Sequence, residues 1–376
     1  MPHEPTTLPR RSVPLLAWYG VSWASEPEPV PQTPQDPDKQ IRPTAAKIDP
    51  AEFGADQLMK QGTGLVVGRF MPPHLGHQFV FDFARQFVDT LHIAVDARGS
   101  SAFTIQAREA WLAEMCPAAK VFRLVTSRTP DATPQILKWV AKVDYLFGSE
   151  PDGYDLAKKI GARFIAVDPQ RAAVPISATQ IREKPIANWD FIPPCVRPRF
   201  VLRVCLMGPE STGKSTLAKK LAEHYKTVFV PEFARTLTDA GRASLLPSDV
   251  QMIARAQLAA EAALARQANR VLFCDTSILQ LMLWSWRVFG VAPKLVTEEA
   301  KNPRHDLCLL MDADVPFVGE SARNQPAERA AFVDHCAKAM EARQQPFVKI
   351  SGSWENRFAA ACDAVDMLIA KGVRQV

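Results

Sequence analysis

The chain of 376 residues is long enough for about two domains of average size and an additional segment. Its hydrophobic content of 47% excludes a wholly disordered protein. Its 45 basic and 40 acidic side chains leave a net charge of +5, which excludes a polycationic nucleic-acid coat but permits local basic pockets that hold phosphates.

The first 60 residues are rich in proline, and many of these prolines alternate with other residues between Glu26 and Pro37. Such prolines lack a backbone donor and favour extended conformations, so residues 1–60 are predicted to form a disordered leader. We prefer an inert leader to a tail that docks a partner.

Arg10 and Arg11 precede a short apolar stretch, which loosely resembles a twin-arginine export signal. The stretch is broken by Pro14, has no clear small-x-small cleavage site and falls short of the roughly 20 residues that span a bilayer. We therefore expect no membrane span, no export and a cytoplasmic protein.

Short apolar runs alternate with helical patterns from residue 61 to about residue 195. This alternation predicts a parallel sheet covered by helices on both faces. The helical patterns include Phe79, Phe83 and Phe87 in one segment and Ile105–Met115 in the next. The predicted strands are Gly64–Gly68, Thr90–Asp96, Val121–Val125, Val143–Phe147 and Arg163–Val167.

A proline-rich joint near residue 195 separates this series from a second one over residues 196–376. The fold class is therefore α/β, with two doubly wound parallel-sheet domains in tandem. The predicted strands of the second domain are Phe200–Met207, Thr227–Val230, Arg270–Asp275, Asp306–Met311 and Phe347–Ile350. Its predicted helices span residues 214–225, 248–268, 276–289, 327–343 and 354–371.

The seven cysteines are scattered along the chain, with no C-x-x-C pair and no close Cys/His cluster. This spacing indicates neither a disulfide framework nor a structural zinc site. We expect most of these cysteines to be small buried hydrophobic residues in a reducing compartment.

The segment Gly208–Ser215 fits the phosphate-binding pattern G-x-x-x-x-G-K-[ST] and lies between a predicted strand and a predicted helix. Its backbone N–H groups are expected to surround phosphate oxygens at the helix N-terminus. Lys214 is expected to reach the β- and γ-phosphates of ATP, and Ser215 to hold Mg²⁺.

Asp275 ends a predicted strand of the same domain, where ligands of open α/β sheets bind. It is a candidate ligand of Mg²⁺ and a candidate general base, and the alternative is that it caps the following helix. Arg323 lies in a candidate lid that would bring a cation to the transition state, and here the alternative is a solvated surface arginine.

The first domain carries His74 and His77 in a loop between a strand and a helix, with Gly76 between them. Imidazoles at a helix start can donate to phosphate oxygens, and glycine permits a close approach of the nucleotide. The alternatives are structural histidines or a metal-binding pair, although no other ligand lies at metal spacing.

A second motif, Ile176–Arg182, follows about 100 residues later and offers hydroxyls and a cation at a probable helix start. Taken alone, it is a helix cap followed by an ordinary arginine. Combined with the histidine motif, it becomes a specific signal for a triphosphate, whose expected ligands are Ser177, Thr179 and Arg182.

These motifs, H-x-G-H and I-S-x-T-x-x-R, resemble those of the nucleotidyltransferase superfamily. Followed by a P-loop kinase half, the chain resembles the NadR-type bifunctional family over roughly residues 64–370, including the tracts Phe147–Pro151, Pro231–Arg235 and Cys274–Thr276. That family joins nicotinamide-mononucleotide adenylyltransferase to ribosylnicotinamide kinase. The resemblance implies a Rossmann-like nucleotidyltransferase domain over residues 61–195 and a P-loop nucleoside kinase domain over residues 196–376.

The resemblance also implies roles for individual residues. In the first domain, ATP would contact Arg69, Phe70, His74, Gly76 and His77, whereas Arg108, Trp111 and Trp139 would lie near the substrate. In the second domain, ATP would contact Gly208, Glu210, Ser211, Thr212, Gly213, Ser215, Thr216 and Arg323, and Glu232 and Arg235 would contact the riboside.

Several positions depart from the family pattern. Tyr-Gly-Arg-Glu appears as Phe233-Ala234-Arg235-Thr236, and a frequent Asp-Gly-x-Arg lid appears as Gly319–Arg323. The segment before Trp139 lacks a Gly-Trp pair that the family has. No N-terminal helix-turn-helix is evident, so the repressor role of some members is not expected.

The function implied by the resemblance is NAD salvage by an Mg²⁺-dependent transferase with two active sites. Its small-molecule partners would be ATP, nicotinamide mononucleotide, nicotinamide riboside and NAD. We expect no nucleic-acid partner, while homo-oligomers are allowed. The alternatives are an enzyme in which only the adenylyltransferase half is active, and a regulator that senses nucleotides through ATP and NAD sites.

Overall fold

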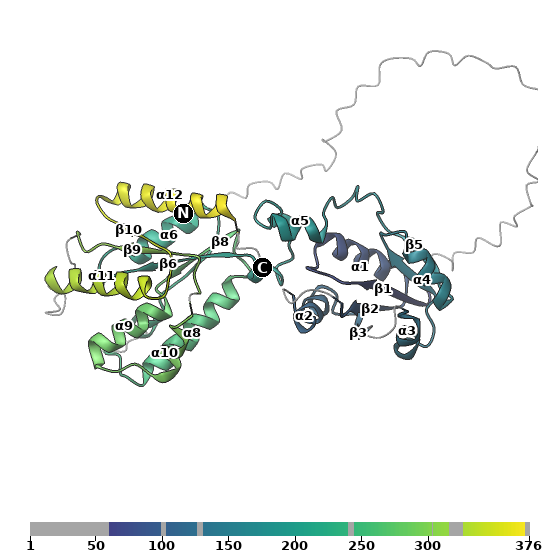
Figure 1. Cartoon of the computed structure of the whole chain (residues 1–376), viewed down its shortest axis with the longest axis horizontal. Coiled ribbons are helices and arrows are strands. Elements are labelled where there is room, and N and C mark those ends of the chain that lie inside the picture. Colours follow the sequence, from purple (N-terminus) through teal and green to yellow (C-terminus); the bar gives the residue numbers. More distant parts are fainter. Residues whose placement is uncertain are drawn as a thin grey trace, which may run out of the picture. The chain divides into compact units, whose positions relative to one another are not determined.

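The computed structural model describes residues 60–98, 103–125, 131–239, 244–302, 304–315 and 326–372. These residues form two five-stranded parallel sheets in tandem along the chain (Figure 1). The predicted leader, apart from Lys60, lies outside the described residues. Residues 58–376 form one compact unit that carries both sheets, so the division at residue 195 stays a prediction.

The first sheet has the strand order β3-β2-β1-β4-β5. The chain builds outward from β1 to β3 and then crosses to β4 on the other side of β1. This reversal creates a switch point at the carboxyl end of β1, where ligands of open α/β sheets bind. The strands are β1 (Thr63–Gly68), β2 (Thr90–Asp96), β3 (Lys120–Leu124), β4 (Tyr145–Gly148) and β5 (Arg163–Ala166).

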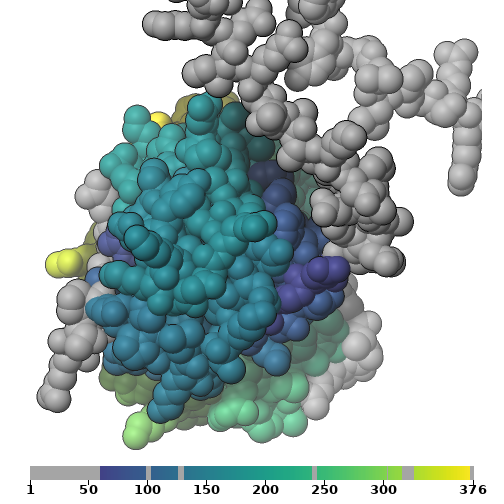
Figure 2. All heavy atoms as spheres, turned by 90° about the vertical axis from the view of Figure 1, so that its right-hand side faces the viewer, coloured from purple at the N-terminus to yellow at the C-terminus, as the bar shows by residue number. Residues whose placement is uncertain are grey.

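Helices cover both faces of this sheet because alternate residues of β1 point to opposite sides. Leu65 packs in a cluster with residues of α3 and α4, whereas Val66 packs with residues of α1 and α2. Residues of this half, in blue and teal, form most of the face turned to the reader in the space-filling view (Figure 2). The helices are α1 (Leu75–Phe87), α2 (Ile105–Met115), α3 (Thr133–Trp139), α4 (Gly153–Ile160) and α5 (Ala178–Glu183).

The second sheet has the order β10-β9-β6-β8-β7, which places β6 between β8 and β9. β8 and β9 are buried throughout, as expected for central strands of a sheet covered on both faces. The strands are β6 (Leu202–Met207), β7 (Phe229–Val230), β8 (Val271–Asp275), β9 (Leu307–Met311) and β10 (Phe347–Ile350).

Two helix layers enclose this sheet. α6 and α12 lie on one side, and α8, α9, α10 and α11 lie on the other (Figure 1). The helices are α6 (Lys214–His224), α7 (Phe233–Asp239), α8 (Asp249–Leu264), α9 (Ile278–Phe289), α10 (Lys294–Glu299), α11 (Pro326–Glu341) and α12 (Trp354–Lys371). None of the described helices is long and apolar enough to cross a membrane.

The predicted α/β class and the tandem parallel sheets are confirmed, and most element boundaries differ by one or two residues. β6 begins at Leu202 rather than Phe200 because a 3₁₀ turn over Arg197–Arg199 precedes it. The N–H groups of Phe200 and Val201 both donate to the carbonyl of Arg197, so they are not available to the sheet.

Candidate functional site

A cavity of about 360 Å³ opens at the switch point of the first sheet. Its volume lies in the range of small-molecule sites. The structure brings together here eight residues predicted to bind ATP, namely Arg69, Phe70, His74, Gly76, His77, Ser177, Thr179 and Arg182.

The two imidazoles are oriented by the backbone of their own loop. His74 caps α1 and accepts from the N–H of Gly76 at its Nδ1 atom, at 3.1 Å. His77 accepts from the N–H of His74, also at Nδ1, at 3.2 Å. In a neutral imidazole with Nδ1 as acceptor, Nε2 carries the proton, so both rings are set to donate from Nε2.

Both histidines are held neutral at physiological pH. Burial lowers the pKa of His74 to about 4, with a smaller contribution from Arg171. Burial also lowers the pKa of His77 well below its usual range, reinforced by His74 and Arg171. Gly76 is required beside them because a Cβ atom at this position would lie 2.9 Å from the His74 ring.

The motif Ile176–Arg182 has a structural role, and several of its residues also line the cavity. Ser177 caps α5, with its hydroxyl bound to Gln180, as the alternative interpretation of this motif predicts. Arg182 donates to the Thr179 hydroxyl at 2.8 Å and to the carbonyl of Met71. These two bonds fix the guanidinium beside the histidine loop.

Phe70 and Arg108 support the site from behind. The Phe70 ring is buried and meets the His77 ring edge to face, with centroids 4.9 Å apart. Arg108 is only 2% exposed and donates to the carbonyls of Arg69 and Asp96 at 2.6 and 2.8 Å. Arg108 therefore positions the Arg69 loop, and the structure does not support the predicted contact with substrate.

The two tryptophans predicted near the substrate do not line the cavity. Trp111 packs against the core beside Phe103, and Trp139 is 62% exposed and stacks on Phe122. Neither indole is among the residues that line the first cavity, and their contact with substrate stays a prediction.

A second cavity of about 780 Å³ adjoins the first and shares Gly68, Arg69, Ser149 and Glu150 with it. Its lining includes Asp96, whose carboxylate forms a bidentate pair with Arg98 at 2.7–3.1 Å. Sequence reasoning missed this extension. The available signal was the position of Asp96 at the end of a predicted strand.

The P-loop of the second sheet connects β6 to α6 and requires glycine at both ends. Gly208 and Gly213 have φ values of +136° and +81°. A Cβ atom on Gly208 would lie 2.6 Å from the carbonyl oxygen of Met311, and one on Gly213 would lie 2.4 Å from the Trp354 ring. Glu210, Ser211 and Thr212 lie between them, and Thr212 donates to the carbonyl of Pro209.

Lys214 is folded back onto its own loop. Its ammonium donates to the carbonyls of Gly208 and Pro209 at 3.0 and 2.9 Å, and its side chain is buried. These two bonds tie the end of the Lys214 side chain to the start of the loop.

Asp275 is 1% exposed, and its Oδ1 atom has no hydrogen-bond partner among the described groups. The alternative role as a helix cap is wrong, because Ser277 caps α9 by accepting from the N–H of Gln280 at 3.1 Å. Asp275 and Ser215 line one cavity of about 670 Å³. A carboxylate and a hydroxyl are oxygen donors of the kind that Mg²⁺ prefers, so these two residues fit the ion.

The same cavity contains the predicted riboside contacts. It is lined by Thr216, Glu232 and Arg235, and the two charged side chains lie 3.8 Å apart. Burial raises the pKa of Glu232, Lys214 opposes this shift, and Asp275 adds to it. Arg323, the predicted lid cation, lies outside the described residues.

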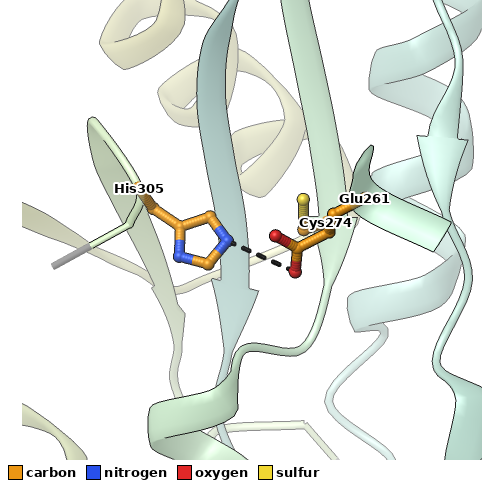
Figure 3. A group of neighbouring side chains, drawn as sticks. All are labelled: Glu261, Cys274 and His305. Atoms are coloured by element: carbon orange, nitrogen blue, oxygen red, sulfur yellow. Dashed lines mark ion pairs between the residues drawn. The ribbon is translucent and has the colours of Figure 1, made fainter. Parts of the chain in front are cut away.

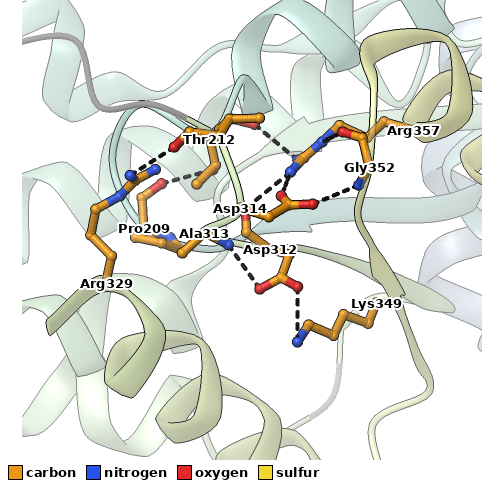
Figure 4. A network of polar contacts seen from close by, with 10 residues as sticks. Pro209, Thr212, Asp312, Ala313, Asp314, Arg329, Lys349, Gly352 and Arg357 are labelled. Atoms are coloured by element: carbon orange, nitrogen blue, oxygen red, sulfur yellow. Dashed lines mark hydrogen bonds and ion pairs between the residues drawn. The ribbon is translucent and has the colours of Figure 1, made fainter. Parts of the chain in front are cut away.

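A buried arginine on α12 connects the P-loop to the ends of β9 and β10 (Figure 4). Arg357 donates to the carbonyls of Gly352 and Thr212 at 2.9 and 3.4 Å and pairs with Asp314. Asp314 in turn accepts from the N–H of Gly352 at 2.6 Å. Sequence reasoning missed this arginine because its partners are remote in the chain.

Comparisons with known proteins agree with this architecture. Residues 203–357 match a family of AAA domains. The chain is 28% identical over 340 residues to the "Trifunctional NAD biosynthesis/regulator protein NadR" of Escherichia coli strain K12, covering 81% of this chain and 83% of that protein. The protein of the same name from Salmonella typhimurium strain LT2 is 26% identical, with 83% and 84% covered.

Two solved structures share the fold. A crystal structure of "NadR protein in complex with NR" is 22% identical with a TM-score of 0.66. A crystal structure of "NadR protein in complex with NAD and AMP-PNP" is 20% identical with a TM-score of 0.67. Each alignment covers 85% of this chain and 99% of the other. The chain is therefore similar to NadR proteins over most of its length, shares with them the fold of two parallel α/β sheets in tandem, and matches the AAA-domain family over residues 203–357.

Proposed function

We propose that this chain forms NAD from nicotinamide mononucleotide and ATP at the first sheet, and phosphorylates nicotinamide riboside with ATP at the second. The observation that carries the proposal is the pair of neutral imidazoles, each with Nδ1 engaged by backbone, in one cavity with Arg182. The P-loop with its folded Lys214 supplies the second phosphate site. The NAD biosynthesis in the names of the relatives supports the choice of substrates.

In the first reaction, a phosphate oxygen of the mononucleotide attacks the α-phosphorus of ATP. The bond to the β-phosphate breaks and pyrophosphate leaves. His74 and His77 donate from Nε2 to phosphate oxygens, and Arg182 offsets the charge that moves onto the leaving group. This chemistry needs positioned donors and no covalent intermediate, in agreement with the residues that line the cavity.

In the second reaction, the 5′-hydroxyl of the riboside attacks the γ-phosphorus of ATP and ADP leaves. Lys214 turns from the loop carbonyls to the phosphates, and Asp275 accepts the hydroxyl proton. When bound, Mg²⁺ would neutralise phosphate charge, and Ser215 and Asp275 are the residues that would hold it. Glu232, in the same cavity, would orient the riboside with Arg235.

One alternative keeps only the adenylyltransferase half active. It is favoured by the segment Phe233-Ala234-Arg235-Thr236, in which a threonine stands where the family pattern has an acid. The described geometry argues for an active kinase half instead, because Glu232, Arg235 and Asp275 still line one cavity with Ser215.

The test is turnover by the purified full chain with ATP and Mg²⁺, given either the riboside or the mononucleotide. We expect NAD to form from either substrate, and the mononucleotide to appear as an intermediate when the riboside is supplied. Chromatography measures both products. Formation of NAD from the mononucleotide but not from the riboside would support the alternative in which only the adenylyltransferase half is active. Binding of ATP and NAD without product would indicate a nucleotide sensor and contradict the proposal.

A further inference from the structure

Three buried polar side chains that neither proposed reaction uses gather at the second sheet (Figure 3). Glu261 comes from α8, Cys274 from β8 and His305 from the segment before β9. One ligand atom from each lies within 4.8 Å of the other two. Residues 261, 274 and 305 are too far apart in sequence to form a recognisable spacing pattern, which is why the sequence indicated no such site.

Two atoms of this cluster lack partners in the interior. The Nε2 atom of His305 and the Oε1 atom of Glu261 have no hydrogen bond within the described part of the chain. They face each other across 3.8 Å, and their side chains are only 6% and 7% exposed. Unpartnered buried polar atoms are rare and costly, so this arrangement points to an additional group between them.

The third donor is a thiol in a row of thiols. The sheet register places Cys205 of β6 beside Cys274 on one side and beside Cys308 of β9 on the other. Cys274 is fully buried, and a cation beside it would compensate the charge of a thiolate.

Nitrogen, thiolate and carboxylate form a donor set that Zn²⁺ uses in proteins. A tetrahedral ion with nitrogen and oxygen ligands at about 2.0–2.2 Å separates these two atoms by roughly 3.3–3.5 Å. The gap between His305 and Glu261 is 3.8 Å, so a small side-chain shift would bring both atoms to an ion. The Nε2 atom of His305 faces Glu261 and has no hydrogen bond within the described residues, so it is placed to bind an ion. A divalent cation with one thiolate and one carboxylate is neutral overall, which makes its burial tolerable.

A small cavity lies beside His305. A cavity of about 20 Å³, large enough for one water molecule, is lined by His305, Cys308 and Ser277. Its rim includes Arg304 and Asn302, which are exposed. His305 is the one proposed ligand among the residues that line this cavity, and a water molecule on that side of the cluster is the fourth ligand that the proposal requires.

We propose that Glu261, Cys274 and His305 bind one divalent transition-metal ion of the zinc class, which ties α8 and β8 to the start of β9. Binding forms bonds to sulfur, oxygen and nitrogen and releases the thiol and carboxyl protons to solvent. Its ligands differ from Ser215 and Asp275 of the Mg²⁺ site, although Cys274 directly precedes Asp275 in β8, and the proposal does not rest on the proposed reactions.

The test uses Co²⁺ as the probe, added to chelator-treated full-length protein. We expect one ion per chain, a thiolate-to-cobalt charge-transfer band, displacement of this band by Zn²⁺ and a higher melting temperature in either metal. Cys274→Ser should lower the affinity about 100-fold or more and remove the band. The matched control is Cys116→Ser, which removes a buried thiol from the half that carries the first sheet. This variant should keep the affinity for Co²⁺ and the charge-transfer band.

Measurements on the wild-type chain make the test independent of how well a variant folds. Absence of the band and of a melting shift at excess Co²⁺ and Zn²⁺ would overturn the proposal. A proton shared between Glu261 and His305 would then be the explanation for the facing atoms. A band that persists in folded Cys274→Ser would also overturn it.

Discussion

The two candidate nucleotide sites differ in how their phosphate donors are held. In the first sheet, His74 and His77 are oriented by N–H groups of their own loop. In the second sheet, Lys214 donates to two carbonyls of the P-loop, and under the proposed function it would exchange them for phosphate oxygens. The proposal therefore implies preorganised donors in the first site and a rearrangement in the second.

The sites differ as well in what supports them. The histidine loop depends on local bonds and on Arg108, which joins it to β2. The P-loop depends on Arg357 of α12 and on Gln280 of α9, which accepts from the N–H of Gly208 at 2.7 Å. Changes far from each loop in the sequence should therefore impair the second site more than the first.

The largest effect is expected for Asp275→Asn, which should lower riboside phosphorylation by about 10²–10⁴-fold while ATP affinity stays within a few-fold. Asparagine keeps the shape but cannot accept the proton. The matched control is Ser277→Ala, which removes the true cap of α9 and should cost about 1 kcal/mol of stability with a near-normal rate. A wild-type rate in folded Asp275→Asn would make Glu232 the next candidate for the base.

Lys214→Ala should reduce riboside phosphorylation by about 10²–10³-fold, because a charge-assisted contact to the transferring phosphoryl group is lost. Adenylyl transfer from the mononucleotide, measured on the same preparation, should be unchanged. Loss of both activities in soluble protein that melts cooperatively would contradict two separate sites.

His77→Ala should have the opposite pattern. Adenylyl transfer should fall by about 10²–10³-fold since one aligned donor is removed, and riboside phosphorylation should remain nearly intact. Separate steady-state assays of each half-reaction measure this. Preserved adenylyl transfer in the folded variant would remove the histidine motif from the site.

Arg357→Ala should lower the free energy of unfolding by about 2–3 kcal/mol, because Asp314 and the carbonyls of Gly352, Thr212 and Asp312 lose their donor. Riboside phosphorylation should fall much more than adenylyl transfer. Lys349→Ala is the control, since Lys349 forms a half-exposed ion pair with Asp312 at 3.0 Å and should contribute at most about 1 kcal/mol. Denaturant unfolding measures the change in stability, and the two activity assays show whether Arg357 supports the second site alone or both sites.

The smallest effect concerns pH. The pKa of His74 is about 4 in the folded state, below its unfolded value of about 6.5, so the unfolded chain binds more protons between these values. The contribution of neutral His74 to the free energy of unfolding should be fully present above pH 6.5 and should decrease as the pH falls toward 4. Melting at pH 7 and pH 5 measures this, and His74→Gln should reduce the difference. A rate of adenylyl transfer that falls between pH 7 and 6 with an ordinary histidine titration would contradict neutral donors.

Most of the architecture could be predicted because it depends on local patterns. The apolar run Thr90–Asp96 and the helices Ile105–Met115 and Trp354–Lys371 form as predicted, since period and capping are encoded within each segment. The histidine loop and the P-loop were recognisable for the same reason. Their phosphate-binding geometry comes from glycines and backbone N–H groups that are adjacent in the chain.

The sequence by itself determined the order of strands and helices and the two phosphate-binding loops, because backbone geometry and hydrophobic period act over a few residues. Only the tertiary structure decided that Arg108 supports the first site from behind, that Trp139 stacks on Phe122, and that Ser277 rather than Asp275 caps α9. It also decided that Glu261, Cys274 and His305 meet. These outcomes depend on contacts between separate elements, and packing and desolvation select such partners without a local pattern.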